Sequence, residues 1–498
     1  MSPTPSPRLQ PLAAGLLATA LLAGCASSRG LAPQSSPASP DALSASRSFK
    51  GHALSAAAFP AQDWWRALGD AQLDGLIAEA LQGTPTLQAA DARLRQAQAQ
   101  AGVADAARKA TLSGTAQVSS VQLPETMVGP SLGGSLKASG VLMANFGYDL
   151  DLWGGKRAAW EEAVDQVHAA QIDAQAARLS LSSAIVRNYI SLAEAFSAQD
   201  VARDERERSA RLLELDRQRA QAGLDSRVGQ HQSESALASA RQQEQAAQQQ
   251  IDALRNVLAE LLGKGPDRGL DIARPGLLSD AAASAATPAI PSELPSELLG
   301  HRPDVVAARW RVEAAQRGID GAKAAFKPSI NLTALVGLVS PSLSDLFTSD
   351  ALFGLGGPAL SLPLFDGGNR RAKLSARDAA YDLAVADYDQ KLVTALRDVT
   401  DALQSARSLD ARIDSTRTAR AAAQSAFDLA RTRYRAGIGT RLDVLAAQKP
   451  LLQLDQQLAT LRAQRLTAAV DLDQALGGGL PLQTPSSPSP IADASTTP

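Results

Sequence analysis

The chain has 498 residues, a formal net charge of -2 and only 4% aromatic residues. This length accommodates two or three ordinary domains, or one repeated architecture. A near-neutral charge gives no general electrostatic attraction to nucleic acid, so no nucleic-acid partner is predicted. Beyond the N-terminus there is no apolar run of about 18 residues, so no internal transmembrane helix is expected.

The first 24 residues are predicted to form a secretory signal peptide. Arg8 precedes an apolar stretch from residue 11 to residue 23, which is followed by Gly24 and Cys25. Cys25 is the single cysteine of the chain, and "LLAGCASS" resembles a bacterial lipobox, in which cleavage before the cysteine is followed by attachment of lipid. This context favours lipidation over a free thiol beside an ordinary cleavage site. In lipoproteins of this kind, Ala26 in place of an aspartate implies export to the outer membrane.

After the signal peptide, the chain is predicted to contain a linker, two copies of a repeat and a tail. Residues 25–60 form a lipidated linker rich in Ser, Ala and Pro, and residues 61–265 form the first repeat. Residues 266–297 connect it to the second repeat, residues 298–478, and residues 479–498 form a disordered tail. The repeat is clearest where "TPTLQAADARLRQAQAQAG" from Thr84 matches "RPDVVAARWRVEAAQRGID" from Arg302. In both copies a proline is expected to open a helix, where its missing N–H is not needed.

Each repeat then continues into two predicted strands. Residues 111–123 and 136–152 are the strands of the first copy, and "PSINLTALVGL" and "LFGLGGPALSLPLFDGG" are those of the second. In 136–152 apolar residues occupy the even positions, such as Leu142, and polar residues such as Asn145 occupy odd ones. This pattern and length suit a strand that crosses a bilayer at a tilt. Pro358 and Pro363 predict an interrupted ladder in the fourth strand.

Four strands cannot close a barrel, and an open sheet edge cannot face lipid. Bacterial outer-membrane barrels begin at about eight strands. Copies of the chain must therefore combine, so that two would supply eight strands and three would supply twelve.

Two very long helices are predicted, over residues 156–222 and 369–436. At about 1.5 Å per residue each is roughly 100 Å long, as in a coiled coil or a tunnel. In the second, apolar residues recur every 3.5 residues from Tyr381 to Thr416, which is the spacing of a coiled-coil seam. Gly223 and Gly437 are predicted to end these helices and to turn the chain into returning helices near 226–262 and 440–476. Pro450 is expected to kink or interrupt the last of these.

Together with the match from Arg302, "WWRALGDAQLDGLIAEAL" from Trp64 and "SLPLFDGGNRRA" from Ser361 resemble the TolC-like outer-membrane efflux proteins, and the lipobox resembles their lipoprotein branch. The resemblance implies a mixed α and β protomer and a homotrimer, in which three chains share a twelve-stranded transmembrane β-barrel and a long α-helical tunnel. It implies a passive conduit for drugs or other small molecules in the outer membrane of a Gram-negative bacterium. The implied partners are a periplasmic adaptor, an inner-membrane resistance-nodulation-division pump and outer-membrane lipid.

Family proteins close at the periplasmic tip, which the resemblance places just before Gly223 and Gly437. Each tip carries an acid three residues before an arginine, namely Glu214 with Arg217 and Asp428 with Arg431. Such residues share a helix face and can bond locally or to a neighbouring helix. We therefore expect these four to form a gate, while a solvated charged face remains the alternative.

Two other classes of protein compete with a channel. The four histidines, at positions 52, 168, 231 and 301, lack metal-ligand spacing, and no nucleophile–base motif or phosphate loop stands out, so an enzyme and a metal or organic cofactor are not predicted. A lipid-anchored periplasmic coiled-coil adaptor or structural protein explains the long helices and the lipid. It does not explain four strands with apolar alternation.

Overall fold

The structure is a computed structural model, and it describes residues 28–39, 54–55, 60–122, 124–130, 134, 136–278, 290–291, 301–340 and 342–479. The predicted signal peptide, Cys25, the residues after Gly479 and much of both linkers lie outside the described residues. The chain divides into two compact units. The first combines described residues from Met1–Pro37, Arg93–Ala170 and Ala308–Tyr388, and the second those from Ala38–Ala92, Gln171–Ala307 and Asp389–Pro498.

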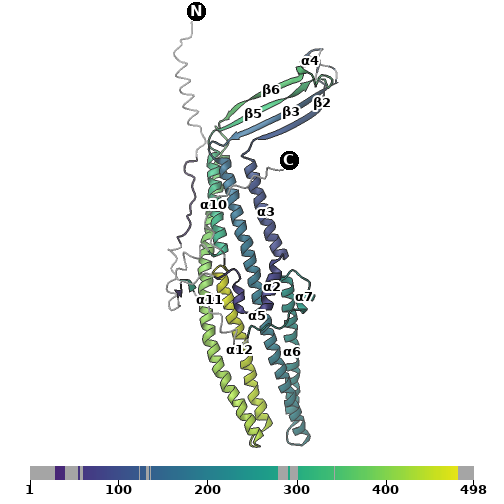
Figure 1. Cartoon of the computed structure of the whole chain (residues 1–498), viewed down its shortest axis with the longest axis vertical. Helices are drawn as coiled ribbons and strands as arrows, with labels where there is room; N and C mark the ends of the chain where they lie inside the picture. Colours follow the sequence, from purple (N-terminus) through teal and green to yellow (C-terminus); the bar gives the residue numbers. More distant parts are fainter. Residues whose placement is uncertain are drawn as a thin grey trace, which may run out of the picture. The chain divides into compact units, whose positions relative to one another are not determined.

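The first unit contains an antiparallel sheet of four strands in the order β2-β3-β5-β6. Figure 1 shows these strands side by side in that order. Their bounds are Thr111–Gln122, Leu136–Leu150, Ser329–Ser340 and Leu352–Ser361. These four strands confirm the predicted ones. Short helices lie in the connections, namely α4 (Glu125–Val128) and η3 (Ser349–Ala351).

The expected break at Pro358 was wrong, because the ladder of β6 continues through it and pairs Pro358 with Leu332. Within this chain β6 is an edge strand, with a partner on one side only. An edge position tolerates proline since one side of the strand needs no N–H donor for a partner. Pro363 follows the last residue of β6, Ser361.

The helices repeat in length as well as in order. The proline-initiated helices α3 (Pro85–Ala106) and α10 (Pro303–Ala324) have 22 residues each. The long helices α5 (Gly155–Gln221) and α11 (Asn369–Arg435) have 67 residues, and the returning helices α6 (Arg227–Leu261) and α12 (Arg441–Ala475) have 35. The predicted helices are thus confirmed to within a few residues. Pro450 lies inside α12, which is one continuous helix, so the expected interruption was wrong.

Smaller elements belong to the second unit. They are η2 (Trp64–Leu68), α2 (Ala71–Leu81), α7 (Asp267–Leu270) and a short parallel pair, β1 (Leu54–Ser55) with β4 (Ile290–Pro291). Asp70 begins α2, because its carboxylate accepts from the backbone N–H groups of Gln72 and Leu73 at 3.0 and 3.1 Å. Such a cap satisfies donors that the first turn of a helix leaves free.

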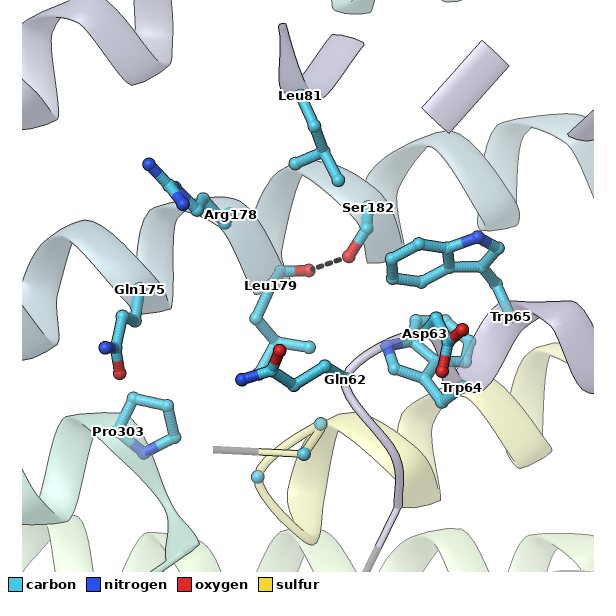
Figure 2. A pocket seen from close by; sticks show the side chains of 13 residues that line it. Gln62, Asp63, Trp64, Trp65, Leu81, Gln175, Arg178, Leu179, Ser182 and Pro303 are labelled. Carbon is cyan, nitrogen blue, oxygen red and sulfur yellow. Dashed lines mark hydrogen bonds between the residues drawn. The ribbon is translucent and has the colours of Figure 1, made fainter. Parts of the chain in front are cut away.

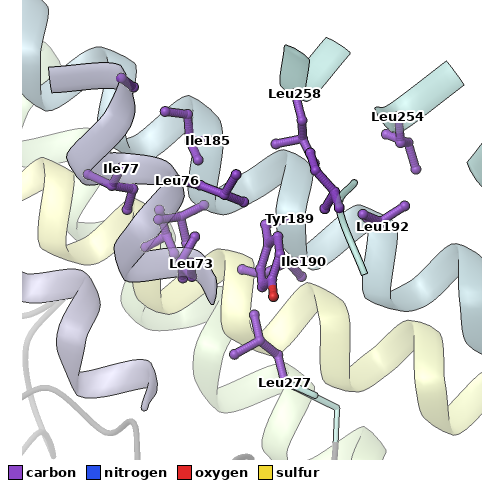
Figure 3. Close-up of a cluster of buried hydrophobic side chains, with 14 of the residues drawn as sticks. Leu73, Leu76, Ile77, Ile185, Tyr189, Ile190, Leu192, Leu254, Leu258 and Leu277 are labelled. Atoms are coloured by element: carbon purple, nitrogen blue, oxygen red, sulfur yellow. The ribbon is translucent and has the colours of Figure 1, made fainter. Parts of the chain in front are cut away.

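The core of the second unit forms where α2 packs on α5, α6 and α12. Figure 3 shows part of it, including Leu73, Ile77, Tyr189, Ile190 and Leu258, each at most 1% exposed. Burying one such leucine or isoleucine contributes about 1.5–3 kcal/mol. Tyr189 adds a polar link inside this core, since its hydroxyl donates to Asp70 at 3.0 Å and accepts from Gln72 at 2.7 Å.

The predicted seam of α11 is buried. Val385, Leu392, Ala395 and Val399 are each at most 1% exposed, and Leu409 and Ile413 are each 6% exposed. Val399 packs with Leu472 of α12, while Leu409 and Ile413 pack with Leu458 and Leu461. From Val399 onward, the 3.5-residue spacing seen in the sequence therefore marks the face by which α11 contacts its returning helix.

Candidate functional site

All four strands of the sheet place apolar residues on one face. Leu142 of β3 is paired with Ala116 of β2 and with Leu338 of β5. Residues directly opposite each other in an antiparallel pair share a face, so the face formed by the even positions of β3 extends onto the neighbouring strands. This apolar face includes Leu112, Val118, Leu142, Phe146, Leu150, Leu332, Val336, Leu338, Leu352 and Leu360. Leu112 and Leu360 are 76% and 70% exposed within the chain, so this face has apolar surface that needs an apolar environment.

The opposite face, here called the polar face, carries mainly hydroxyl and amide side chains. It includes Thr111, Ser113, Thr115, Gln117, Ser119, Ser139, Asn145, Asn331 and Thr333. The hydroxyls of Ser119 and Ser139 are 2.8 Å apart across two strands. This face is not polar throughout: it also carries Val141 and Met143 of β3 and Leu335 and Val339 of β5. On β6 it is apolar at Phe353 and Leu355, which the sequence pattern did not reveal because "LFGLGG" shows no clear alternation.

The turns that lead from strand to long helix are capped by aspartates. Asp151 accepts from the backbone N–H groups of Lys156 and Arg157 at 3.1 and 2.7 Å, next to the start of α5. Asp366 accepts from those of Gly368 and Arg370 at 3.1 and 3.0 Å, next to the start of α11. Sequence reasoning missed both caps. The available signal was an acid just before the Gly-Gly turn in each copy.

Aromatic side chains lie at these same turns. Trp153 follows β3, is 47% exposed and donates from its indole nitrogen to the carbonyl of Pro328 at 2.6 Å. The ammonium group of Lys327 lies 4.7 Å from the centre of the Trp153 ring. Phe365, after β6, is 90% exposed. An amphipathic aromatic beside a cation suits the boundary between an apolar layer and water.

The two long helices end in the same hydrogen-bonded turn. Gly223 and Gly437 have φ of 70° and 74°, a conformation that glycine adopts without strain. The N–H of each glycine bonds three residues back, and the N–H of the next residue, Leu224 or Ile438, bonds five residues back. This is the Schellman pattern, in which glycine lies just beyond the helix. Leu224 and Ile438 are 72% and 70% exposed, so both turns present an aliphatic side chain.

The four expected gate residues differ in their contacts. Arg217 bonds Glu234 of the returning helix α6 at 3.1 Å, and Glu214 accepts from Gln218 at 2.8 Å. Hydrogen bonds from the side chains of Gln230, Arg217 and His231, in decreasing order of effect, lower the pKa of Glu234 to about 2.

In the second hairpin, Asp428 accepts from Gln424 at 3.1 Å. Among the residues that the structure describes, Arg431 has no ion-pair partner, and no bond joins it to Asp428. The structure therefore does not join the residues of either expected pair to each other within one chain.

A charged cluster in the second unit was not identified from the sequence. Arg302, 9% exposed, pairs with Asp304 and Asp398 at 2.8 Å each, which ties the start of α10 to α11. Nearby, Arg187 of α5 bonds Asp471 of α12 at 2.7 Å. The signal was the "RPD" at the start of the second copy, where the first copy has "TPT". This cluster positions four helices and has no obvious chemical role.

A second cluster, in the first unit, brings carboxylates close together. Arg317 of α10 contacts Glu161 at 3.3 Å and Asp165 at 3.9 Å on α5. Burial, followed by the nearby charge of Glu313, raises the pKa of Asp165 to about 6. One turn along α5, His168 stacks on Trp310 with ring centres 4.5 Å apart.

Neither cluster forms a recognisable catalytic centre. Across the described residues, no group of three or more His, Cys, Asp or Glu side chains is placed to hold a metal ion. A search of the same residues found no helix with the length and apolar character needed to cross a membrane. The features that remain are a sheet with one apolar and one polar face and long helical hairpins that end in glycine turns.

Comparison with known proteins agrees with these features. The outer membrane efflux protein family matches residues 76–264 and 294–478, so both copies of the repeat are covered. The fusaric acid resistance protein FusA of Burkholderia cepacia is 40% identical over 373 residues, which are 74% of this chain and 69% of that protein. The multidrug resistance outer membrane protein MdtP of Escherichia coli K12 is 30% identical over 477 residues, 93% of this chain and 94% of that protein.

The crystal structure of the outer membrane protein VceC from Vibrio cholerae is also similar. It matches with a TM-score of 0.75 and 36% identity, over 84% of this chain and 100% of that chain. The family match and these similarities cover the strands and the helical hairpins alike. The chain therefore belongs to the outer membrane efflux protein family and is an efflux channel of the outer membrane.

Proposed function

We propose that three copies of the chain form one conduit, with a twelve-stranded barrel in the outer membrane and a helical tunnel in the periplasm. The observation that carries this proposal is the sheet. Within the described residues β2 and β6 each have one neighbour, so each leaves an open edge. Open edges do not occur in lipid, and joining β6 of one copy to β2 of the next removes them.

The number of copies follows from the width of the lumen. Two copies give eight strands, and a barrel of about eight strands is just wide enough for side chains to fill. A conduit needs a lumen, so three copies and twelve strands are the smallest set that serves the function. The apolar face of the sheet then contacts lipid and the polar face lines the passage.

The transported compounds are small molecules, including antibiotics, which pass without chemical change and without a cofactor. Support comes from the similarity to FusA, a fusaric acid resistance protein, and to MdtP, a multidrug resistance protein. A channel of this kind has no energy source of its own. We therefore assign it a periplasmic adaptor and an inner-membrane pump of the resistance-nodulation-division class as partners.

The test uses a strain that lacks this channel. Restoring the gene is expected to raise resistance to several antibiotics, and migration of an unheated sample at the mass of three chains is expected to report assembly. A functional protein that migrates as a dimer or monomer after mild cross-linking would rule out the trimer.

The same proposal assigns the closed state to the ends of the long helices. Arg217 and Arg431 occupy the same position in α5 and α11. Arg217 is held by Glu234 of its own hairpin, but α12 has Gln448 at the equivalent position, which leaves Arg431 available for a neighbouring helix. Asp428, one turn away on α11, accepts from Gln424 of its own helix, and we infer that it also reaches a neighbouring helix. Bonds from Asp428 and Arg431 to neighbouring helices keep the tip closed at rest, and Glu214 and Arg217 support them.

The double variant Asp428→Ala, Arg431→Ala is expected to raise single-channel conductance in planar bilayers. It is also expected to sensitise cells to large antibiotics. The matched control is Glu214→Ala with Arg217→Ala in the first hairpin, for which we expect a smaller increase. Closed-level conductance for Asp428→Ala, Arg431→Ala in a fully assembled channel would mean that these residues do not form the gate.

Cys25, outside the described residues, is proposed to carry the lipid anchor and to be the first mature residue. Several acyl chains on one cysteine anchor a protein firmly, whereas one chain gives marginal binding. Mass spectrometry of the mature N-terminal peptide tests this, and an unmodified Cys25 would contradict it. Because the barrel is a second anchor, Cys25→Ala is expected to slow maturation more than it reduces insertion.

A further inference from the structure

The second unit contains a cavity that the channel function does not use. Its volume is about 530 Å³, and it lies where η2, α2, α5, the start of α10 and the turn after α12 converge. Figure 2 shows its lining, with Gln175 and Arg178 on α5, Pro303 at the first position of α10, and Trp64 and Trp65 on η2. A cavity of this size is within the range that small ligands occupy.

The cavity is shaped by close packing around its floor. Gly477, Gly478 and Gly479 follow α12 with φ of 97°, 55° and 82°. A Cβ atom at Gly478 would collide with the side chain of Leu179. Larger residues therefore cannot replace this glycine without moving the wall, and the turn holds Leu179 as part of the lining.

Two polar atoms of the lining are buried and have no partner. The indole nitrogen of Trp64 has no hydrogen bond in the described structure, although the residue is only 7% exposed. An indole N–H is a donor only, so Trp64 requires an acceptor, and a buried donor without one is unfavourable. Figure 2 shows this nitrogen on the edge of the ring that faces Gln62 and Leu179. The side-chain oxygen of Gln175, also in the lining, is the second such atom.

The lining contains two charged residues, Asp63 and Arg178, and Arg178 supplies a positive charge without an ion-pair partner among the described residues. Asp63 pairs with Arg66 at 3.2 Å and is thereby neutralised. Arg178 forms no ion pair or hydrogen bond with any residue that the structure describes. The rest of the wall combines the apolar side chains of Trp65, Leu81, Leu179 and Pro303 with the polar side chains of Gln62 and Ser182. The site thus offers a cation, a buried N–H donor and an apolar surface.

The geometry points to a binding site for a small organic anion, namely a carboxylate on a flat apolar body. The carboxylate pairs with Arg178, a second acceptor atom takes the N–H of Trp64, and the body lies against Trp65 and Leu179. A guanidinium group binds a planar carboxylate through two hydrogen bonds, which favours this anion over a halide. All residues of this site belong to one unit of one chain.

Tryptophan fluorescence supplies a local probe. The chain has five tryptophans, and the triple variant Trp153→Phe, Trp160→Phe, Trp310→Phe leaves only Trp64 and Trp65, which both line the cavity. The ligand used is benzoate, with benzamide and benzylamine as uncharged and cationic analogues of the same size. The protein is the complete assembled channel in a neutral detergent.

We expect saturable quenching by benzoate, with a dissociation constant of about 1 mM or below. Benzamide and benzylamine are expected to bind at least about tenfold more weakly. Arg178→Gln is expected to raise the benzoate constant by a similar factor, while Arg211→Gln, an exposed arginine of the same helix, leaves it unchanged. Trp64→Phe removes the N–H donor and keeps an aromatic side chain, and it is tested with 4-acetylbenzoate, whose ketone oxygen supplies the second acceptor. The variant is expected to weaken binding of 4-acetylbenzoate more than binding of benzoate, as measured by calorimetry.

No saturable binding below about 10 mM would show that the cavity is not a site for this class of ligand. Equal affinity for all three compounds would also overturn the proposal, because it would indicate apolar filling without recognition of charge. If the fluorescence variant fails to assemble, calorimetry on the unsubstituted protein measures the same three constants.

Discussion

Leu142→Arg tests which face of the sheet contacts lipid, and Asn145→Arg is its matched control. Both residues lie on β3, three positions apart, and therefore on opposite faces. Leu142 is 41% exposed and lies between Ala116 and Leu338 on the apolar face. Asn145 lies on the polar face, where its amide is 3.5 Å from the hydroxyl of Thr115.

The expected cost follows from the position of Leu142 along the strand. β3 runs from Leu136 to Leu150, so Leu142 is close to its middle and far from either boundary. An arginine on the lipid face costs about 2–4 kcal/mol at the bilayer midplane and about 0–1 kcal/mol near the interfaces. About 1.4 kcal/mol corresponds to a tenfold change in an equilibrium constant. We therefore expect Leu142→Arg to lower the folded-to-unfolded ratio by roughly 30- to 1000-fold per chain.

Urea titration of the channel refolded into lipid vesicles measures this ratio. The folded fraction is measured on gels of unheated samples, in which the folded channel and the unfolded chain form separate bands. Leu142→Arg is expected to shift the midpoint to lower urea, while Asn145→Arg shifts it little, because an arginine on the polar face remains in water.

Equal shifts for the two variants would refute the assignment of faces. A larger shift for Asn145→Arg would reverse the assignment, so that the even positions of β3 would line the passage. Ala144 lies on the same face as Leu142, two residues further along β3. Ala144→Arg is therefore expected to lower the urea midpoint as Leu142→Arg does, which would exclude a steric effect that is specific to Leu142.

Three further predictions concern the helices. Tyr189→Phe removes the hydroxyl that bonds Asp70 and Gln72 but keeps the buried ring. The loss is expected to be about 1–2 kcal/mol, so amide hydrogen exchange in α2 is expected to accelerate by about 5- to 30-fold. Unchanged exchange would show that this link contributes nothing. Asp165 has its pKa raised from 3.8 to about 6, so its charge opposes folding above pH 6 and this opposition disappears as the pH falls toward 4. Asp165→Asn is therefore expected to raise the free energy of unfolding at pH 8 by about 1–2 kcal/mol, a value discounted for the partial solvent exposure of this carboxylate, and to have no effect near pH 4. The change is measured as a higher thermal midpoint at pH 8, and a benefit at low pH alone would contradict this sign. Gly437→Ala places a Cβ on a residue with φ of 74° and is expected to cost about 1–2 kcal/mol, with faster exchange confined to the ends of α11 and α12; a global change in exchange would show that the turn is coupled to the whole hairpin.

Much of the fold was evident from residue order. The period of two in "SLKASGVLMANFGYDL" and the 3.5-residue period from Tyr381 to Thr416 both come from alternation along one element, and each correctly placed a face. Prolines at the start of α3 and α10 and glycines after α5 and α11 are local signals for where a helix begins or ends. These periodicities and helix-end signals depend only on residues close together in the sequence, so they can be identified without knowing which other segments lie nearby in the fold.

Contacts between distant segments required the fold. The pairing of Arg302 with Asp398, of Arg187 with Asp471 and of Tyr189 with Asp70 joins residues far apart in the chain, and no spacing in the sequence relates them. Pro358 and Pro450 show the opposite case, in which a local rule predicted a break that the structure does not have. The other ladder pairs of β6 and the packing of α12 outweigh the preference of a single proline, because many contacts act against one missing hydrogen bond.

The candidate gate shows the same division. The acid and arginine at each helix end were visible in the sequence, because residues three apart share a helix face. Their partners were not, because Arg217 bonds Glu234 across the hairpin whereas the equivalent position beside Arg431 is Gln448. Two segments that share the acid, the arginine and the glycine turn thus differ in their contacts, because the side chains on the returning helices that they face are different.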